Sequence, residues 1–426
     1  MQTDPRRRIP RTDDLLADPG IVAAAAGLHP LIVRGTIRRA QQVARTGDIE
    51  PESVCTHVAR ELEAVESPAV INATGVIVHT NLGRSALSKA AQDALSSASG
   101  YAAVEFDPST GQRARRGRIV TQDLLDRMPG AQDALVVNNG AAALLLAVLA
   151  LPGEVLLARG EMVEIGDGFR LHEMLTGAGI TVTEVGATNR VHPRDYADAL
   201  GANTGCILKV HPSNFETVGF TASVSTHILA QMGPPVVVDI GSGLLEPNPM
   251  FSREPDARTA LADGGDLVTF STDKLLGGPQ GGVIVGRADL VHRARRHPLA
   301  RAMRADKLTL AALSATLRAD QKPPTRAMAE ADTSDLERRL RRIQERVGGE
   351  LVSTHGVIGG GSAPGARIPG PALSFAASLA APLRRGSPAV VARTHADRCV
   401  IDLRCVPPAC DDAVAEALVA ALQAQV

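Results

Sequence analysis

Lys274 follows a short apolar stretch of this sequence and precedes a run of glycines. The stretch 267–270 is typical of a buried strand, which the small polar residues Ser271 and Thr272 end. Burial lowers the pKa of a lysine amine, and the neutral amine is a nucleophile toward carbonyl carbons. The chain has five lysines against forty arginines, so a lysine in this setting stands out. We expect a nucleophilic lysine; the alternative is a solvated lysine in a loop before a glycine turn.

A helix start upstream of Lys274 is suited to binding a phosphate group. The apolar run 134–137 predicts a strand, and the run 141–151 predicts an apolar helix directly after it. Backbone N–H groups at a helix start are free to bind an anion, and the helix dipole favours negative charge there. The residues that we expect at this phosphate site are Asn139, Gly140, Ala141 and the hydroxyl-bearing Ser271.

Asp239 ends the apolar run 236–238, and a carboxylate in that position is costly unless a cation accompanies it. The protonated ring nitrogen of pyridoxal phosphate is such a cation, and the pair keeps the ring an effective electron sink. The alternative is an aspartate that caps a turn. His211 and Asn214 follow the preceding strand, where either side chain could contact the ring face or its phenolic oxygen. Together with Lys274, these residues predict a pyridoxal phosphate site.

Short apolar runs alternate with helical segments after Pro68. This alternation predicts an α/β fold with a mainly parallel sheet and helices on both faces. We expect three domains: an N-terminal helical domain (1–66), a large α/β domain that binds pyridoxal phosphate (67–300) and a small C-terminal α/β domain (301–426). The glycine run 359–361 is expected to be a hinge before the last strands.

The N-terminal segment has three helix-start signals, at Asp13, Pro30 and Pro51. Four arginines fall on or near one face of the helix that begins at Pro30: Arg34, Arg38, Arg39 and Arg45. This face is expected to contact a nucleic-acid backbone. The alternative is an ordinary solvated face, because nearby acids balance its charge.

Composition excludes several other classes of function. The formal net charge is −1 and there is no tryptophan, so neither whole-molecule attraction to nucleic acid nor an aromatic stacking platform is indicated. The five cysteines lack metal-ligand spacing, so we expect reduced thiols and no metal site. No apolar run reaches the ~20 residues of a membrane span, which favours a soluble cytoplasmic protein.

Six motifs lie in order along the chain, at 72–85, 138–142, 186–190, 209–215, 273–280 and 306–310. Together they resemble the motifs of the bacterial selenocysteine synthase family, the L-seryl-tRNA(Sec) selenium transferases. The resemblance runs from about residue 70 to 405 and implies a fold-type-I pyridoxal phosphate enzyme in which Lys274 carries the cofactor. It also implies a homodecameric ring with active sites at subunit interfaces.

Four positions depart from the family's pattern. Thr272 stands where the family usually has glycine, and Asp167 replaces a small residue. The segment 111–119 has lost a tyrosine and a histidine, at Gly117 and Ile119. Any role of those two side chains is therefore in doubt, whereas Arg113 and Arg116 remain.

The resemblance implies conversion of seryl-tRNA(Sec) to selenocysteinyl-tRNA(Sec) with selenophosphate, through a dehydroalanyl-tRNA intermediate. Asp239 would keep the ring nitrogen protonated, and Lys274 would take the Cα proton. Selenophosphate is a small polyanion that forked guanidinium groups suit. The expected ligands are Arg84, Arg301 and Arg304, of which the last two are expected one helical turn apart. The alternatives for the basic segment 291–305 are a solvated surface and a contact with the tRNA backbone.

Two rival functions remain open at this point. The first is a pyridoxal phosphate lyase that eliminates water or ammonia from a small amino or sugar acid. The second is a non-catalytic tRNA-binding or scaffold protein. The N-terminal helical segment favours the tRNA enzyme over the lyase, and the retained Lys274 and Asp239 argue against the scaffold.

Overall fold

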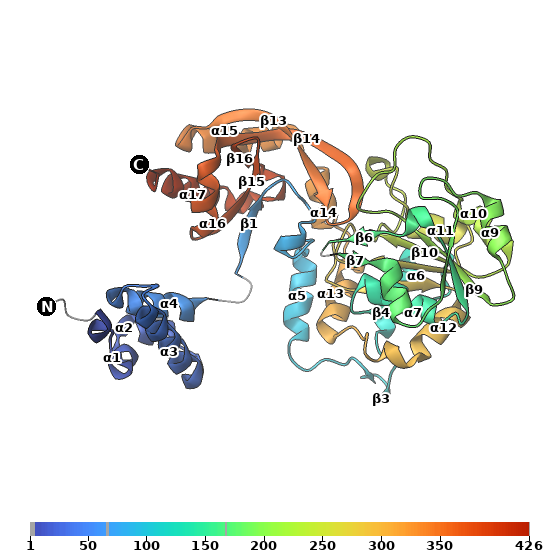
Figure 1. Cartoon of the computed structure of the whole chain (residues 1–426), viewed down its shortest axis with the longest axis horizontal. Helices are drawn as coiled ribbons and strands as arrows, with labels where there is room; N and C mark the ends of the chain where they lie inside the picture. The colour runs from blue at the N-terminus through green and yellow to red at the C-terminus, as the bar shows by residue number, and fades with distance from the viewer. Residues whose placement is uncertain (1–4, 65–67, 167, 426) are drawn as a thin grey trace. The chain divides into compact units, whose positions relative to one another are not determined.

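The computed structural model describes residues 5–64, 68–166 and 168–425. The chain forms two compact units, Met1–Val70 and Ile71–Val426 (Figure 1). None of the described helices is long and apolar enough to cross a membrane. The expected boundaries at residues 66 and 300 stay a prediction.

The first unit is a small helical bundle around one apolar core. Its helices are α1 (Thr12–Ala17), α2 (Pro19–Ala24), α3 (Pro30–Thr46) and α4 (Val54–Glu63), with 3-10 turns η1 (Pro5–Arg8) and η2 (Pro51–Ser53). Prolines occupy the first helical positions of α2, α3 and η2, where their missing N–H costs nothing. Residues such as Ile21, Ile37 and Val58 are fully buried between the helices. The three expected helix starts are confirmed.

The second unit is built on a seven-stranded sheet with the order β4-β12-β11-β10-β9-β5-β8. All of its neighbouring strands are parallel except β12, which runs antiparallel to β11 and β4. The expected mainly parallel sheet is therefore confirmed. The strand bounds are Asp133–Val137 (β4), Glu154–Ala158 (β5), Val182–Val185 (β8), Thr204–Val210 (β9), Val236–Gly241 (β10), Leu267–Ser271 (β11) and Gly282–Gly286 (β12).

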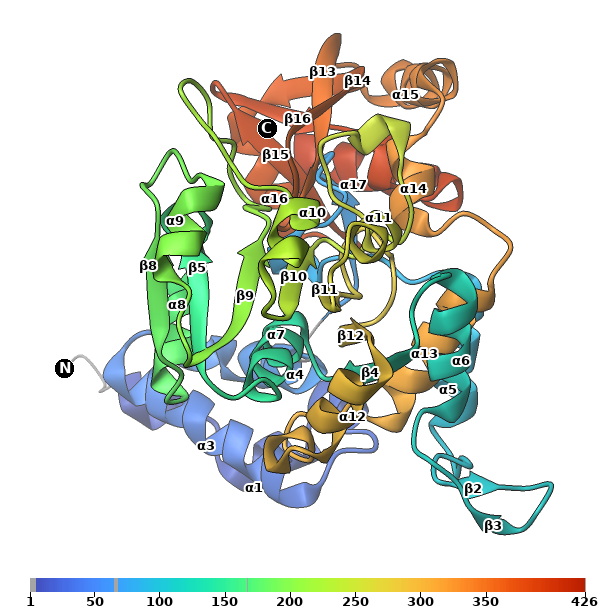
Figure 2. The same cartoon turned by 90° about the vertical axis from the view of Figure 1, so that its right-hand side faces the viewer.

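Helices cover both faces of this sheet because successive strand residues point to opposite faces. Along β10, Val236 and Val238 pack in one apolar core and Val237 in the other. On the first face lie α6 (Arg118–Arg127), α11 (Ala257–Ala262) and α13 (Lys307–Arg318), and on the second lie α7 (Gly140–Leu149), α8 (Leu171–Gly177) and α12 (Ala288–Arg296). The remaining helices of this region are α5 (Lys89–Ala98), α9 (Pro193–Ala199) and α10 (Thr226–Leu229). Figure 2 shows the β2–β3 hairpin (Phe106–Asp107, Gln112–Arg113) extending from the body of the unit.

A five-stranded sheet with the order β1-β15-β16-β14-β13 forms the smaller layer of the second unit. Its strands are β1 (Val70–Ala73), β13 (Glu350–Gly359), β14 (Ser362–Ala376), β15 (Ala389–His395) and β16 (Arg398–Ile401). The helices are α14 (Pro324–Ala329), α15 (Thr333–Val347), α16 (Ala380–Arg385) and α17 (Asp411–Gln423). In Figure 1 the long strands β13 and β14 run from this sheet toward the larger one.

The expected glycine hinge is instead the tight turn of the β13–β14 hairpin. Gly359, Gly360 and Gly361 all have positive φ, at 78°, 57° and 69°. A side chain is strained in that conformation, and a Cβ on Gly360 would lie 2.4 Å from Val78 Cγ1. The hinge prediction was wrong because a run of glycines indicates unusual backbone angles without telling a hinge from a turn.

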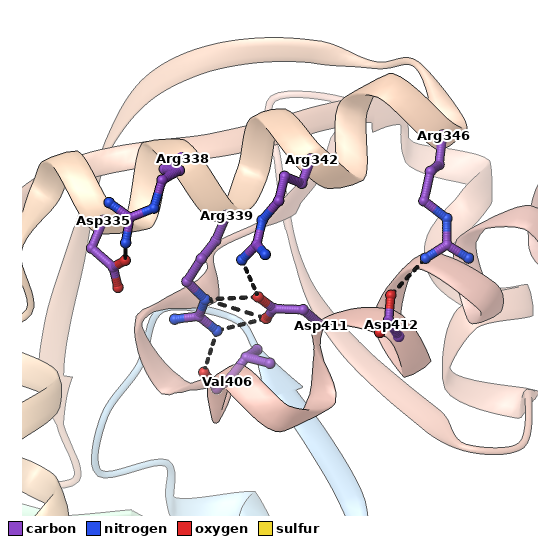
Figure 3. Close-up of polar contacts among 8 residues, drawn as sticks. All are labelled: Asp335, Arg338, Arg339, Arg342, Arg346, Val406, Asp411 and Asp412. Atoms are coloured by element: carbon purple, nitrogen blue, oxygen red, sulfur yellow. Dashed lines mark hydrogen bonds and ion pairs between the residues drawn. The ribbon is translucent and has the colours of Figure 1, made fainter.

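Helices α15 and α17 are joined by ion pairs (Figure 3). Arg339, whose side chain is 6% exposed, donates to both carboxylate oxygens of Asp411 and to the carbonyl oxygen of Val406. Arg342, whose side chain is 67% exposed, lies 3.7 Å from the same carboxylate. Asp411 opens α17, where the helix dipole also favours negative charge.

Candidate active site

Lys274 lies in the turn that follows β11 and is buried, with 8% of its surface exposed. Its Nζ donates a hydrogen bond to the carbonyl oxygen of Gly361 at 3.3 Å. Burial, followed by the nearby Arg84 guanidinium, lowers the pKa of this amine despite the carboxylates of Asp239, Asp273 and Glu254. The burial of Lys274 therefore excludes the alternative of a solvated lysine in a loop. The lowered pKa favours the neutral form of its amine.

Asp239 lies on β10, directly beside the strand that leads to Lys274. Parallel pairing of β10 with β11 sets it opposite Thr269, whose Oγ1 donates to Oδ1 at 2.8 Å. Burial raises the pKa of Asp239, and it outweighs the hydrogen bond from Thr269 and the attraction of Lys274 and His211. Burial therefore disfavours the charged form of this carboxyl, and an added cation would stabilise that form.

The expected phosphate site is assembled by strand β12. Gly282 of β12 lies opposite Ser271 of β11 on one side and Val137 of β4 on the other. The hydroxyl of Ser271 consequently reaches the start of α7, where a Cβ added to Gly140 would lie only 2.3 Å from Ser271 Oγ. Asn139 caps α7 by accepting the Ala142 N–H at 2.8 Å. The structure therefore brings together the residues expected at the phosphate.

His211 and Asn214 have different surroundings. The backbone N–H of His211 donates to the Asp239 carbonyl oxygen at 2.9 Å, so His211 adjoins the site. Asn214 is exposed, and its Nδ2 donates to the Glu164 carbonyl oxygen at 2.7 Å. Buried Ser213 is closer to the lysine: a Cβ on Gly361 would lie 3.6 Å from Ser213 Oγ and 3.5 Å from Lys274 Nζ.

The arginines expected to bind the second substrate are only partly brought together. Arg84 adopts a φ of 65°, and its Nη1 lies 2.8 Å from Oδ2 of Asp273, the residue before Lys274. Arg301 and Arg304 are not one helical turn apart, because the 3-10 turn Pro298–Ala300 ends before them and α13 begins after them. That part of the prediction was wrong: the segment leaves helical geometry to pair with β4.

The backbone of Arg304 nevertheless lies beside the residues expected at the phosphate. It forms an antiparallel bridge with Val137, and the N–H of Asn138 donates to the Met303 carbonyl oxygen at 2.9 Å. The Arg304 guanidinium lies 3.4 Å from Glu105, which also binds Arg113 and Arg116. Hydrogen bonding from Arg113 and the charges of Arg304, Arg113 and Arg116 lower the pKa of Glu105 despite its partial burial. Arg301 is exposed, and no ion pair is recorded for it among the residues that the structure describes.

The departures from the family's pattern have partial structural explanations. The hydroxyl of Thr272 donates to the Pro279 carbonyl oxygen and so braces the glycine turn after Lys274. Gly117 precedes α6 with a φ of 69°, a left-handed conformation that glycine adopts without strain. Ile119 is half exposed on the first turn of α6. Asp167 lies outside the described residues.

Sequence reasoning missed Glu254, Ser213 and the carbonyl of Gly361. Glu254 lies after the short turn Pro249–Phe251, and its buried Oε2 is 3.4 Å from His211 Nε2. No local pattern marks it, since contacts between distant segments create its role. Asp273 directly precedes Lys274 in the same motif, so its position in the sequence already indicated that it lies near the lysine. A cleft of about 970 Å³ opens beside His211 and Glu254, at the carboxyl ends of β5 and β9 and next to Val238 of β10.

The site fits pyridoxal phosphate on the evidence of this chain alone. Several buried polar atoms on residues beside the lysine have no hydrogen-bond partner among the described residues, namely His211 Nε2, Ser242 Oγ, Glu254 Oε1 and Asp273 Oδ1. Such atoms are costly to bury unless a ligand completes their bonding. The helix start with Ser271 suits the phosphate, Asp239 suits a protonated ring nitrogen, and Lys274 suits the aldehyde carbon.

Comparison with known proteins gives the family. A family model for L-seryl-tRNA selenium transferase matches residues 70–407, and one for the selenocysteine synthase N terminal matches residues 6–45. The L-seryl-tRNA(Sec) selenium transferase of Moorella thermoacetica is 40% identical, over 99% of this chain and 97% of the relative. That of Geobacter metallireducens is 41% identical, over 93% and 95%.

Among solved structures, D-glucosaminate-6-phosphate ammonia-lyase superposes with a TM-score of 0.59 at 21% identity, covering 87% of this chain and 99% of that one. At this identity the likeness concerns the fold. The match of the family model over most of the sequence, together with the near-complete relatives, identifies the chain as a member of the L-seryl-tRNA selenium transferase family.

Proposed function

We propose that this chain replaces the serine hydroxyl of seryl-tRNA(Sec) by selenium from selenophosphate, with pyridoxal phosphate as cofactor. The observation that carries the proposal is the buried Lys274 amine, set beside the Asp239 strand in a chain that matches the transferase family over residues 70–407. Lys274 and Asp239 would hold the ring. Asn139, Gly140, Ala141 and Ser271 would hold the phosphate, with His211 against the ring and Asn214 in a looser supporting role.

Bound pyridoxal phosphate supplies the electron sink that makes the seryl Cα–H acidic. Lys274 Nζ, whose pKa burial lowers, accepts the Cα proton as a general base. Asp239 keeps a proton on the ring nitrogen and so maintains the sink. The β-hydroxyl would leave as water and give an electrophilic Cβ. Selenium from selenophosphate would then add to this carbon, and hydrolysis of the P–Se bond would release phosphate.

Arg84, Arg301 and Arg304 are our candidates for binding selenophosphate. Arg84 is fixed by Asp273 next to the lysine, and the Arg304 backbone adjoins the phosphate site. Arg301 is exposed and available to an anion. Forked guanidinium donors match phosphate oxygens, which supports arginine in this role.

The N-terminal unit is our candidate for binding the tRNA. Arg34 and Arg38 are exposed one helical turn apart on α3, whereas Arg39 is bound to Glu61. We further propose that the protein works in the cytoplasm as a homo-oligomer, a decamer by family resemblance. The small-molecule lyase remains the alternative function, but it gives the N-terminal unit no role.

A transfer assay tests the proposal. The protein is incubated with pyridoxal phosphate, seryl-tRNA(Sec) and selenophosphate, and the amino acid released from the tRNA is identified by mass spectrometry. Selenocysteine is the expected product. Unchanged serine, combined with turnover of a small amino or sugar acid, would favour the lyase.

A further inference from the structure

Glu254 is a buried carboxylate that contacts two separate walls of the active site. Its side chain is 1% exposed. Oε2 lies 3.4 Å from His211 Nε2, at the end of β9, and accepts the Ala363 N–H at 2.8 Å, at the start of β14. It also belongs to the charged surroundings of Lys274. A carboxylate this deeply buried costs free energy unless its partners compensate it.

The partners of Glu254 are themselves constrained. The backbone N–H of His211 donates to the Asp239 carbonyl oxygen. This bond holds the backbone of His211, whereas its side chain can still rotate. Its Nε2 is buried and forms no hydrogen bond within the described chain, although Glu254 Oε2 lies only 3.4 Å away. A carboxylate accepts hydrogen bonds, so it favours ring orientations that turn Nε2 toward Glu254.

On the other wall, Glu254 binds a strained backbone. Ala363 has a φ of 45°, a left-handed conformation that strains a non-glycine residue. Two residues earlier, Gly361 presents the carbonyl oxygen that accepts the hydrogen bond from Lys274 Nζ. The contact between Glu254 and Ala363 thus helps to hold the turn whose carbonyl meets the lysine.

We propose that Glu254 is a positioning residue that orients the His211 ring and holds the β13–β14 turn against Lys274. Glu254 thereby couples two walls of the site. The effect of Glu254 on cofactor binding rests on the proposed function. Its hydrogen bond to the Ala363 N–H is present in the cofactor-free chain. The two parts are therefore tested separately.

The first experiment is hydrogen–deuterium exchange of the cofactor-free protein, read by mass spectrometry on peptides covering 359–366. Glu254→Ala is expected to speed exchange in this segment, whereas Glu254→Gln, which keeps an acceptor for the Ala363 N–H, is expected to speed it much less. Glu184→Gln is the control, because Glu184 lies on β8, pairs with Arg159 and is more exposed than Glu254. Unchanged exchange in a folded Glu254→Ala protein would overturn the proposed hold on the turn.

The second experiment measures the dissociation constant of pyridoxal phosphate by absorbance titration. Glu254→Ala is expected to weaken binding by about tenfold or more, the size expected for a lost bond to a charged group. In a His211→Phe background the same substitution is expected to have a much smaller effect, because the ring to be fixed is gone. Equal effects in both backgrounds would overturn the coupling to His211. Absence of cofactor binding in the unmutated protein would instead contradict the proposed function, while the exchange result still stands.

Discussion

Lys274 and Gly361 stand 87 positions apart in the chain, and the lysine Nζ lies 3.3 Å from the glycine carbonyl oxygen. The lysine follows a strand of the larger sheet, and the glycine belongs to a hairpin of the smaller one. The smaller sheet therefore supplies one wall of the site around the lysine. Substitutions in the β13–β14 turn are expected to affect the lysine although they lie far from it in sequence.

Asp239 allows a prediction about stability without cofactor. Burial raises the pKa of its carboxyl above the ordinary value of 3.8, so the folded protein binds this proton more tightly than the unfolded chain does. The carboxylate consequently destabilises the folded state once the pH exceeds the folded pKa, and this cost vanishes as the pH falls to the unfolded pKa. Asp239→Asn should raise the melting temperature of the cofactor-free protein at neutral pH by roughly 1–3 °C, and the gain should shrink toward pH 4.

Melting curves from pH 4 to 8 check this expectation, with exposed Asp320→Asn as control. With pyridoxal phosphate present the order should reverse, because the amide no longer pairs with a ring cation. A cofactor-free Asp239→Asn protein that melts lower than the unmutated one at neutral pH would contradict the account of this carboxylate.

Arg84 is expected to act on the second substrate. Arg84→Ala should raise the KM for selenophosphate by about tenfold or more, since a charge-assisted bond contributes about 1.5–3 kcal/mol, and should leave the affinity for seryl-tRNA(Sec) nearly unchanged. Steady-state kinetics with each substrate varied in turn provide the measurement. Arg338→Ala on α15, with a side chain 69% exposed, serves as control. A rise in the KM for seryl-tRNA(Sec) alone would indicate instead that Arg84 contacts the tRNA backbone.

The N-terminal unit should bind tRNA through exposed arginines. Replacing Arg34 and Arg38 together by alanine should weaken tRNA binding and reduce the slope of log K against log salt concentration by about 1–2. Arg39→Ala should change the slope less, because Glu61 already engages that guanidinium. Filter binding across a salt series gives both quantities. An unchanged slope in the double variant would remove these two arginines from the tRNA contact.

In the α15–α17 contact, Asp411 forms a buried ion pair with Arg339 and a solvent-exposed one with Arg342. Arg339→Met should destabilise this part of the protein by about 2–4 kcal/mol, since it leaves a largely buried Asp411 without its main partner. Arg342→Ala should cost less than ~0.5 kcal/mol, because its contact is long and solvated. Hydrogen exchange in the first turn of α17 measures the difference. Similar exchange in both variants would show that burial does not set the strength of this pair.

Much of the fold could be predicted because its signals are local. Apolar runs of strand length end close to the residues that carry chemistry, so the sequence alone orders Lys274, Asp239 and the Asn139–Ala141 junction along a mainly parallel sheet. Helix starts at Pro30 and Pro51 followed from the backbone angle that proline imposes.

The remaining parts of the site depend on contacts between distant segments. Nothing near Glu254 in sequence indicates that it meets His211 and Ala363. The spacing of Arg301 and Arg304 suggested a helix, but pairing with β4 is the interaction that this segment makes. Asn214 was expected at the site because it follows a strand. Its neighbour Ser213 is instead the residue whose side chain lies near Lys274.

The central claim is that Lys274 carries a cofactor that reacts with one particular aminoacyl-tRNA. The most direct test is the visible absorbance spectrum of the cofactor-loaded protein during titration with seryl-tRNA(Sec), with seryl-tRNA(Ser) as control. The account predicts a spectral change with the first tRNA and none with the second, and loss of the starting absorbance band in Lys274→Ala but not in Lys307→Ala. A band that persists in Lys274→Ala, or one indifferent to both tRNAs, would contradict it.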